Sequence, residues 1–189
     1  LARLAELSAR GVRVVLFTGN HDMWCYDYLA QECGVEIVRN PRVVEFDGVK
    51  VHLAHGDNLN ISGQPMLKLM NTIFRSSVAR TLFSWLVHPD LALRFGLWWS
   101  GKSRKSHNKT LMGVDNLRPL VEYAREHNLK NGDVEHYISG HMHLPHYVRE
   151  ERFEVLFLGD WCGAEAVYAT MDDDNNLKLN TFAIDETVS

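Results

Sequence analysis

The sequence predicts a layered α/β (α+β) sandwich whose core is interrupted by a helical insertion. Three observations predict this architecture. Short apolar runs alternate with amphipathic helical patterns, polar turns follow several of those runs, and residues 58–112 break the alternation with helix-like, aromatic-rich sequence. With 189 residues, 46% of them hydrophobic, the chain can bury one core. We expect residues 1–57 and 113–189 to form the two parts of that core, with residues 58–112 as the insertion.

The first part of the core is expected to combine helices with short strands. The β-branched run over residues 12–18, VRVVLFT, is typical of a strand buried on both faces. Asp47-Gly48 between two apolar runs is a strong hairpin signal. The other elements expected here are helices over residues 1–10 and 23–33, each followed by a glycine, and strands over residues 35–38, 43–46 and 49–54.

The second part continues the same alternation. An amphipathic helix is expected over residues 113–127, with Leu117, Leu120, Val121 and Ala124 on one face. The acidic run at residues 172–176 lacks the glycine and the distal glutamate of a calcium loop, so a polar hairpin turn is favoured. Strands are expected over residues 136–139, 153–158, 165–170 and 177–181.

The insertion carries an unusual charge. From Asn60 to Thr110 there are eight basic residues and one acidic residue, so this segment has a charge of +7 and leaves −11 on the remainder of a chain of net charge −4. A basic segment on an acidic body indicates an anionic partner for that segment. Its aromatic residues add apolar surface beside the cations, and they are Phe74, Phe83, Trp85, Phe95, Trp98 and Trp99.

Cysteine usage and hydropathy favour a cytoplasmic location. The three cysteines, Cys25, Cys33 and Cys162, are odd in number and contain no C-x-x-C pair, which is typical of a reducing compartment. The most apolar stretch, residues 81–99, is interrupted by His88-Pro89-Asp90 and by Arg94. Such a segment can lie on a membrane surface but is not expected to cross the bilayer.

Three short turns offer histidine after apolar runs: Gly19-Asn20-His21-Asp22, His55-Gly56-Asp57 and Gly140-His141-Met142-His143. One amide oxygen and several imidazoles suit manganese, iron or zinc, and they are poor ligands for calcium. A surface loop rich in histidine would explain the last turn alone. Together the three turns favour a metal-dependent phosphoesterase.

Each turn residue has an expected role. His141 and His143 are two positions apart, which on extended chain places both rings on one side. His21 beside Asp22 can be oriented and kept cationic, ready to contact a phosphate oxygen or protonate a leaving group, so these two are the candidate catalytic residues. Asp57 is expected to support a ring or a loop rather than bind metal.

The series G-N-H-D, H-G-D and G-H-x-H resembles the second half of the calcineurin-like metallophosphoesterase signature. The resemblance implies a metallophosphoesterase-like βαββαβ core. It also implies two divalent metal ions, manganese being the expected ion, that share a bridging aspartate and a bridging water. Position by position, it implies that Asn20, His55 and His141 bind one metal, that His143 binds the other, and that His21 assists the phosphate.

Within that family the chain looks like the branch that cleaves UDP-2,3-diacylglucosamine in lipid A assembly. The resemblance rests on the segments F-T-G-N-H-D-M-W, L-A-H-G-D and L-G-D-W and on the long insertion. It implies a lipid-linked nucleotide substrate, UMP and 2,3-diacylglucosamine 1-phosphate as products, and an enzyme peripheral on the cytoplasmic face of the inner membrane. Arg80, Lys102 and Lys105 of the insertion are the candidate substrate-binding cations.

The chain departs from the family pattern at its beginning, because no D-x-H or G-D-x-x-D element precedes residue 12. Those elements supply most ligands of the second metal, and we expect roughly one further βαβ-length stretch upstream. Two other functions stay open. The substrate could be a soluble nucleotide or a phosphoprotein, or the chain could be a non-catalytic metal-binding module. Nucleic acid is the less favoured partner for the basic segment.

Overall fold

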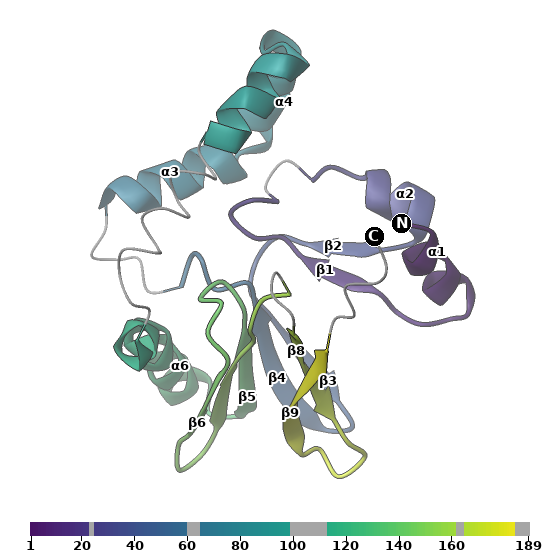
Figure 1. The fold of residues 1–189 in the computed structure, drawn as a ribbon. Coiled ribbons are helices and arrows are strands. Elements are labelled where there is room, and N and C mark those ends of the chain that lie inside the picture. The colour runs from purple at the N-terminus through teal and green to yellow at the C-terminus, as the bar shows by residue number, and fades with distance from the viewer. Residues whose placement is uncertain (23–24, 60–64, 99–112, 162–164, 184–189) are drawn as a thin grey trace. The chain divides into compact units, whose positions relative to one another are not determined.

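The computed structural model describes residues 1–22, 25–59, 65–98, 113–161 and 165–183 (Figure 1). The chain forms two compact units. One contains Leu1–Asn40 and Ile61–Met112, and the other contains Pro41–Asn60 and Gly113–Ser189. The helices of the insertion therefore belong with the first forty residues, and each unit has its own secondary structure.

The N-terminal part of the first unit contains a small parallel sheet. Strands β1 (Val15–Phe17) and β2 (Glu36–Val38) pair in parallel, with Val15 opposite Glu36. The expectation that this first strand is buried on both faces is wrong, because Val15 is 36% exposed. The described part of this sheet has only these two strands, and so small a sheet cannot bury both faces. Helices α1 (Ala2–Ala9) and α2 (Tyr28–Cys33) precede β1 and β2, respectively.

The insertion is mostly helical over residues 65–98, as the sequence predicts. Helix α3 (Pro65–Arg75) is followed by α4 (Ser77–Leu86), and residues 89–98 are also helical. The hydroxyl of Ser76 caps α4 by accepting a hydrogen bond from the backbone N–H of Ala79 at 3.3 Å. Among the described residues, no helix has the length and apolar character needed to cross a bilayer.

Within the described residues of the second unit, five strands form a mixed sheet in the order β3-β4-β5-β7-β6. Strands β4, β5 and β7 are parallel to one another, and β3 and β6 run antiparallel at the two edges. Asp47 and Gly48 both have positive φ, so the predicted hairpin between β3 and β4 is confirmed. The bounds are β3 Arg42–Phe46, β4 Val49–Ala54, β5 Val134–Ser139, β6 His146–Arg149 and β7 Glu154–Phe157.

Helix α6 (Arg118–Asn131) follows a short 3₁₀ turn, η1 (Val114–Leu117), and contributes the buried face that the sequence predicts. Its side chains pack against Tyr137 of β5 and Phe157 of β7 in the main apolar cluster. Strands β8 (Glu165–Met171) and β9 (Leu177–Ala183) form a hairpin across the predicted polar turn. Figure 1 shows α6 and this hairpin flanking the five-stranded sheet.

The sheet face under α6 also contains a polar cluster. His52 of β4 is almost fully buried, and its Nε2 lies 3.2 Å from the hydroxyl of Tyr123. His127 Nδ1 lies 3.0 Å from the hydroxyl of Tyr137, and the rings of His52 and His127 are 5.0 Å apart. Burial, reinforced by the neighbouring His127, lowers the pKa of His52 to about 4, while burial raises the pKa of Tyr137 to about 12. Both imidazoles are therefore held neutral at neutral pH, since burial also lowers the pKa of His127.

We predict that this cluster makes the stability of the protein depend on pH. The unfolded chain protonates His52 near its ordinary pKa of about 6.5, whereas the folded chain resists protonation until about pH 4. The unfolded state thus binds more protons between these values, and the free energy of unfolding falls as pH falls through that window. The full loss from this one group is about 3 kcal/mol.

The measurement is urea unfolding of wild type and His52→Leu at several pH values from 7.5 to 4. Because other groups also titrate, the quantity to compare is the difference in slope between the two proteins. His146→Asn on β6, which removes an imidazole outside the cluster, serves as the control and should keep the wild-type slope. An equal slope in wild type and His52→Leu would contradict the prediction.

Candidate functional site

Two of the three histidine turns lie side by side because their strands are parallel neighbours. Ala54 at the end of β4 pairs with Ser139 at the end of β5. The backbone N–H of Gly140 then donates a hydrogen bond to the carbonyl of His55 at 3.0 Å, so the pairing continues into both turns. Parallel pairing therefore places His55-Gly56-Asp57 next to Gly140-His141-Met142-His143.

Glycine permits this close approach. Gly56 has a φ of +115°, and a Cβ added there would lie 3.3 Å from the Cβ of His141 and 3.5 Å from that of Ser139. A side chain at position 56 would therefore meet both strained backbone and a crowded neighbour. The glycine lets the turn after β4 pass directly beside His141.

The rings of His55 and His141 stand 5.2 Å apart, centre to centre, at an interplanar angle of 65°. An imidazole nitrogen binds a divalent ion such as zinc at about 2.0–2.1 Å, which puts the ring centre about 3.3 Å from the ion. Two rings on one ion at angles between 90° and tetrahedral are then about 4.6–5.4 Å apart. The observed separation falls within this range, so the pair has the spacing of two imidazoles on one ion.

The backbone of the last turn differs from the sequence-based expectation. His141 and His143 have φ values of +63° and +53°, so both residues are left-handed rather than extended. The extended backbone that the sequence analysis expected for these two residues is therefore wrong. Strand alternation ends at Ser139, and the N–H of Met142 folds back to the carbonyl of Gly140 at 2.7 Å. Non-glycine residues adopt this conformation at a cost of about 1–3 kcal/mol each, and such strain is concentrated at functional sites.

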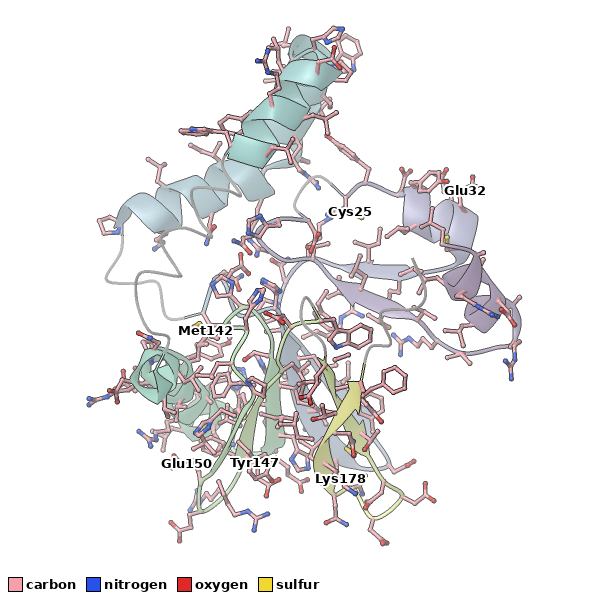
Figure 2. All side chains as sticks on the ribbon, in the orientation of Figure 1. Cys25, Glu32, Met142, Tyr147, Glu150 and Lys178 are labelled. Atoms are coloured by element: carbon pink, nitrogen blue, oxygen red, sulfur yellow. The ribbon has the colours of Figure 1, made fainter. Side chains whose placement is uncertain are left out.

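A carboxylate that the sequence analysis did not assign contacts His143. Asp160 follows β7, and its Oδ2 lies 2.9 Å from Nδ1 of His143. Asp160 stands after the third parallel strand of the sheet, one strand beyond the two histidine turns. The available signal was a polar residue after an apolar run, in the segment L-G-D-W. Figure 2 labels Met142 within the turn that carries His143, and Tyr147 and Glu150 towards the other end of the sheet.

The turn after β1 belongs to the first unit. Asn20 is half-buried, and His21 and Asp22 are exposed. The turn is closed by two contacts between Gly19 and Asp22: the N–H of Gly19 donates to the Asp22 carboxylate at 3.3 Å, and the N–H of Asp22 donates to the Gly19 carbonyl at 3.1 Å. Asp22 thus has a structural contact within its own turn, and the assignments of Asn20 as a ligand and of His21 and Asp22 as catalytic residues stay predictions.

Of the candidate substrate-binding cations, only Arg80 lies within the described residues, whereas Lys102 and Lys105 lie outside them. Arg80 is on α4, with its guanidinium 5.6 Å from the centre of the Tyr26 ring. The hydroxyl of Tyr26 also donates to the carbonyl of Arg80 at 3.0 Å. These contacts connect the loop before α2 to the insertion. Trp99 and the side chain of Phe74 also lie outside the part of the chain that the structure describes.

The donor chemistry fits part of a divalent-metal centre. Across the part of the chain that the structure describes, no group of three or more His, Cys, Asp or Glu side chains is close enough to hold a metal ion. His55 and His141 nevertheless have the spacing of paired ligands, and His143 has a carboxylate partner of the kind that orients metal-binding imidazoles. The second unit therefore brings together three of the histidines that the sequence predicts as metal ligands.

The class of protein follows from comparison with known families. Residues 1–145, which include all three turns, match the family model described as calcineurin-like phosphoesterase. The chain therefore belongs to the calcineurin-like phosphoesterase family, which is a family of metal-dependent enzymes.

Several relatives of this chain share one name. The chain is 36% identical over 175 residues to the UDP-2,3-diacylglucosamine hydrolase of Porphyromonas gingivalis, covering 85% of this chain and 66% of that protein. The proteins of the same name from Pseudomonas fluorescens strain Pf0-1 and Haemophilus ducreyi are 26% and 25% identical, covering 95% and 84% of this chain and 71% and 65% of their own lengths. The chain thus spans about two thirds of the length of these relatives.

We predict that Gly56→Ala lowers both stability and metal affinity. A Cβ at φ +115° is strained, and it would press on His141, so the free energy of unfolding should fall by about 1–3 kcal/mol. The same pressure should move His141 from His55 and weaken binding of Mn²⁺, measured by electron paramagnetic resonance of the free ion.

Gly132→Ala is the matched control. Gly132 ends α6 at φ +72° with nothing within 4 Å of an added Cβ, so the substitution introduces backbone strain without crowding. It should lower stability and leave Mn²⁺ binding unchanged. If Gly56→Ala binds Mn²⁺ as tightly as Gly132→Ala does, the close approach of the two turns is not what places the imidazoles.

Proposed function

We propose that this protein hydrolyses the diphosphate of UDP-2,3-diacylglucosamine, giving UMP and 2,3-diacylglucosamine 1-phosphate, a reaction of lipid A assembly. The observation that carries the proposal is the adjacency of the His55 and His141 rings at the ends of two parallel strands, in a chain of this phosphoesterase family. The shared name of the relatives supports the choice of substrate.

The proposed cofactor is a pair of divalent metal ions, with manganese as the expected ion. Asn20, His55 and His141 would hold one ion, and His143 would contribute to the other. When bound, such ions lower the pKa of a coordinated water and neutralise charge on the phosphoryl oxygens. The imidazole spacing and the Asp160 contact to His143 support the histidine assignments.

The catalytic roles proposed for this chain's own residues concern positioning and proton supply. In the hydrolysis, water adds to one phosphorus of the diphosphate and the bond from that phosphorus to the bridging oxygen breaks. His21 is exposed on its turn, where a cationic ring can donate a hydrogen bond to a phosphate oxygen or a proton to the leaving phosphate. Asp22 closes that turn and so fixes the backbone that carries His21.

The insertion is the proposed binding region for the lipid part of the substrate. Helix α4 exposes large apolar side chains, with Trp85 86% and Leu86 79% exposed, on a segment of net charge +7. Apolar side chains suit acyl chains, and Arg80, Lys102 and Lys105 suit the phosphates. The same composition suits peripheral binding to the anionic cytoplasmic face of the inner membrane. Cys25 and Cys33 are free thiols, in keeping with a cytoplasmic location.

We predict that His141→Ala abolishes Mn²⁺-dependent release of UMP from detergent-dispersed UDP-2,3-diacylglucosamine while the protein remains folded. The ring of His141 is one of the paired imidazoles, so its loss removes a proposed ligand without opening the apolar core. UMP release is measured by chromatography, and folding by circular dichroism. His146→Ala on β6 is the control and should retain wild-type activity.

The alternatives give different results in the same assay. A phosphoesterase for soluble substrates would cleave a soluble nucleotide diester at least as well as the lipid substrate. A non-catalytic module would cleave neither and would retain one equivalent of metal or none in elemental analysis. Full activity of His141→Ala with Mn²⁺ would contradict the ligand assignment.

We predict that exposed apolar residues of α4 contribute to membrane binding. Replacing Trp85 and Leu86 together by serine should lower the affinity for vesicles containing anionic phospholipid by tenfold or more, as measured by sedimentation. The reason is that burying one large apolar side chain contributes about 1.5–3 kcal/mol. The control is Leu129→Ser on α6, where an equally exposed leucine lies outside the insertion. Equal binding by the α4 variant and wild type would remove this helix from the membrane contact.

A further inference from the structure

The contact between Asp160 and His143 extends the site beyond the residues assigned so far. We propose that Asp160 is a positioning residue that holds the imidazole of His143 with its proton on Nδ1, leaving Nε2 available to a metal ion. The inference rests on the proposed function only through the assignment of His143 as a ligand. The geometry that carries it is the 2.9 Å separation between Asp160 Oδ2 and His143 Nδ1.

The backbone brings Asp160 to this place through the third parallel strand. Ser139 at the end of β5 pairs with Phe157 at the end of β7, and the N–H of Leu158 donates to the carbonyl of Ser139 at 2.8 Å. The chain after β7 thus begins beside the start of the Gly140–His143 turn. Asp160 comes two residues later, within reach of the last histidine of that turn.

The residues on either side of Asp160 fix the segment. A Cβ on Gly159 would lie 2.8 Å from Cγ of Pro145 and 3.0 Å from Cβ of Val167, so only glycine allows the chain to pack so closely here. On the other side, the indole N–H of Trp161 donates to the carbonyl of Val167 at 2.8 Å. Asp160 is therefore held between a tight packing contact and a hydrogen bond, both of which involve β8.

The contact with Asp160 restricts the ring of His143, which is otherwise largely exposed among the described residues. Its side chain is 57% exposed, and the strained left-handed backbone fixes the Cα but not the rotation of the imidazole. An exposed ring samples several orientations and either tautomer, and ordering it has an entropic cost. A carboxylate only accepts hydrogen bonds, so at Nδ1 it selects the ring that carries a proton there. The nitrogen that remains, Nε2, then has a free lone pair for a cation.

The first test determines the tautomer of His143 in metal-free protein by nuclear magnetic resonance, so it does not depend on activity. The imidazole ¹⁵N signals of wild type, Asp160→Asn and Asp160→Ala are compared at about pH 9, where imidazoles of ordinary pKa are neutral. Wild type should show His143 protonated on Nδ1. Asp160→Ala should shift the signals toward the Nε2-protonated form, and Asp160→Asn, whose amide oxygen still accepts a hydrogen bond, should lie between them.

The second test measures the dissociation constant for Mn²⁺ by electron paramagnetic resonance. Loss of a carboxylate that orients a metal-binding histidine typically weakens affinity by about 10–100-fold, so Asp160→Ala should fall in this range and Asp160→Asn should recover part of the loss. Asp173→Asn, in the exposed turn between β8 and β9, is the control and should change neither readout. Urea unfolding should be similar for all variants, because Asp160 is 38% exposed.

An unchanged tautomer together with wild-type Mn²⁺ affinity in Asp160→Ala would overturn the positioning role. A changed tautomer with unchanged affinity would overturn the link between Asp160 and the metal. Failure of the proposed function would give a different result, because wild-type protein would then release no UMP, whatever the tautomer of His143.

Discussion

The parallel pairing of β4, β5 and β7 is the constraint on which the candidate site in the second unit depends. Because carboxyl ends of parallel strands meet at one edge of a sheet, three separate turns leave that edge together. The first supplies His55, the second His141 and His143, and the third Asp160. Main-chain hydrogen bonds from Gly140 and Leu158 continue the pairing past the last strand residues. The sheet thus fixes where each of the three turns begins.

Close backbone approach and local strain refine this arrangement. Gly56 and Gly159 occupy positions where a Cβ would meet a neighbouring residue, and each lies next to a residue of the candidate site. Between them, His141 and His143 adopt left-handed conformations that are unusual for residues with a Cβ. The surrounding structure must stabilise these conformations, and the neighbouring residues Met142 and Leu144 pack against the main apolar cluster.

Local sequence signals predicted much of the fold. Asp47-Gly48 identified a hairpin, and the spacing of Leu117, Leu120, Val121 and Ala124 identified the buried face ahead of and within α6, because these features depend on residues close in sequence. Strand β6 was not predicted, since HYVR is short and polar and its pairing with β7 gives it its structure. The exposure of β1 was also not predicted, because an apolar run does not indicate how many strands will flank it in the sheet.

The sequence likewise predicted only part of the candidate site. The histidine turns were predicted from residue type and from their position after apolar runs. The left-handed backbone of the last turn and the contact of Asp160 with His143 were not predicted, because both depend on the register between β5 and β7 and on packing against β8. Contacts between residues far apart in the chain produce no periodic pattern in the sequence.

The site also has a consequence for the order of folding during synthesis. Val51 of β4 pairs with His136 of β5, about 85 residues later, so the central strand pair cannot form until most of the chain has left the ribosome. Closing so long a segment costs about 4 kcal/mol of chain entropy, yet doubling or halving its length changes that cost by only about 0.6 kcal/mol. The intervening helices can therefore be lengthened, shortened or rebuilt in evolution with little effect on the strand pairing that they interrupt.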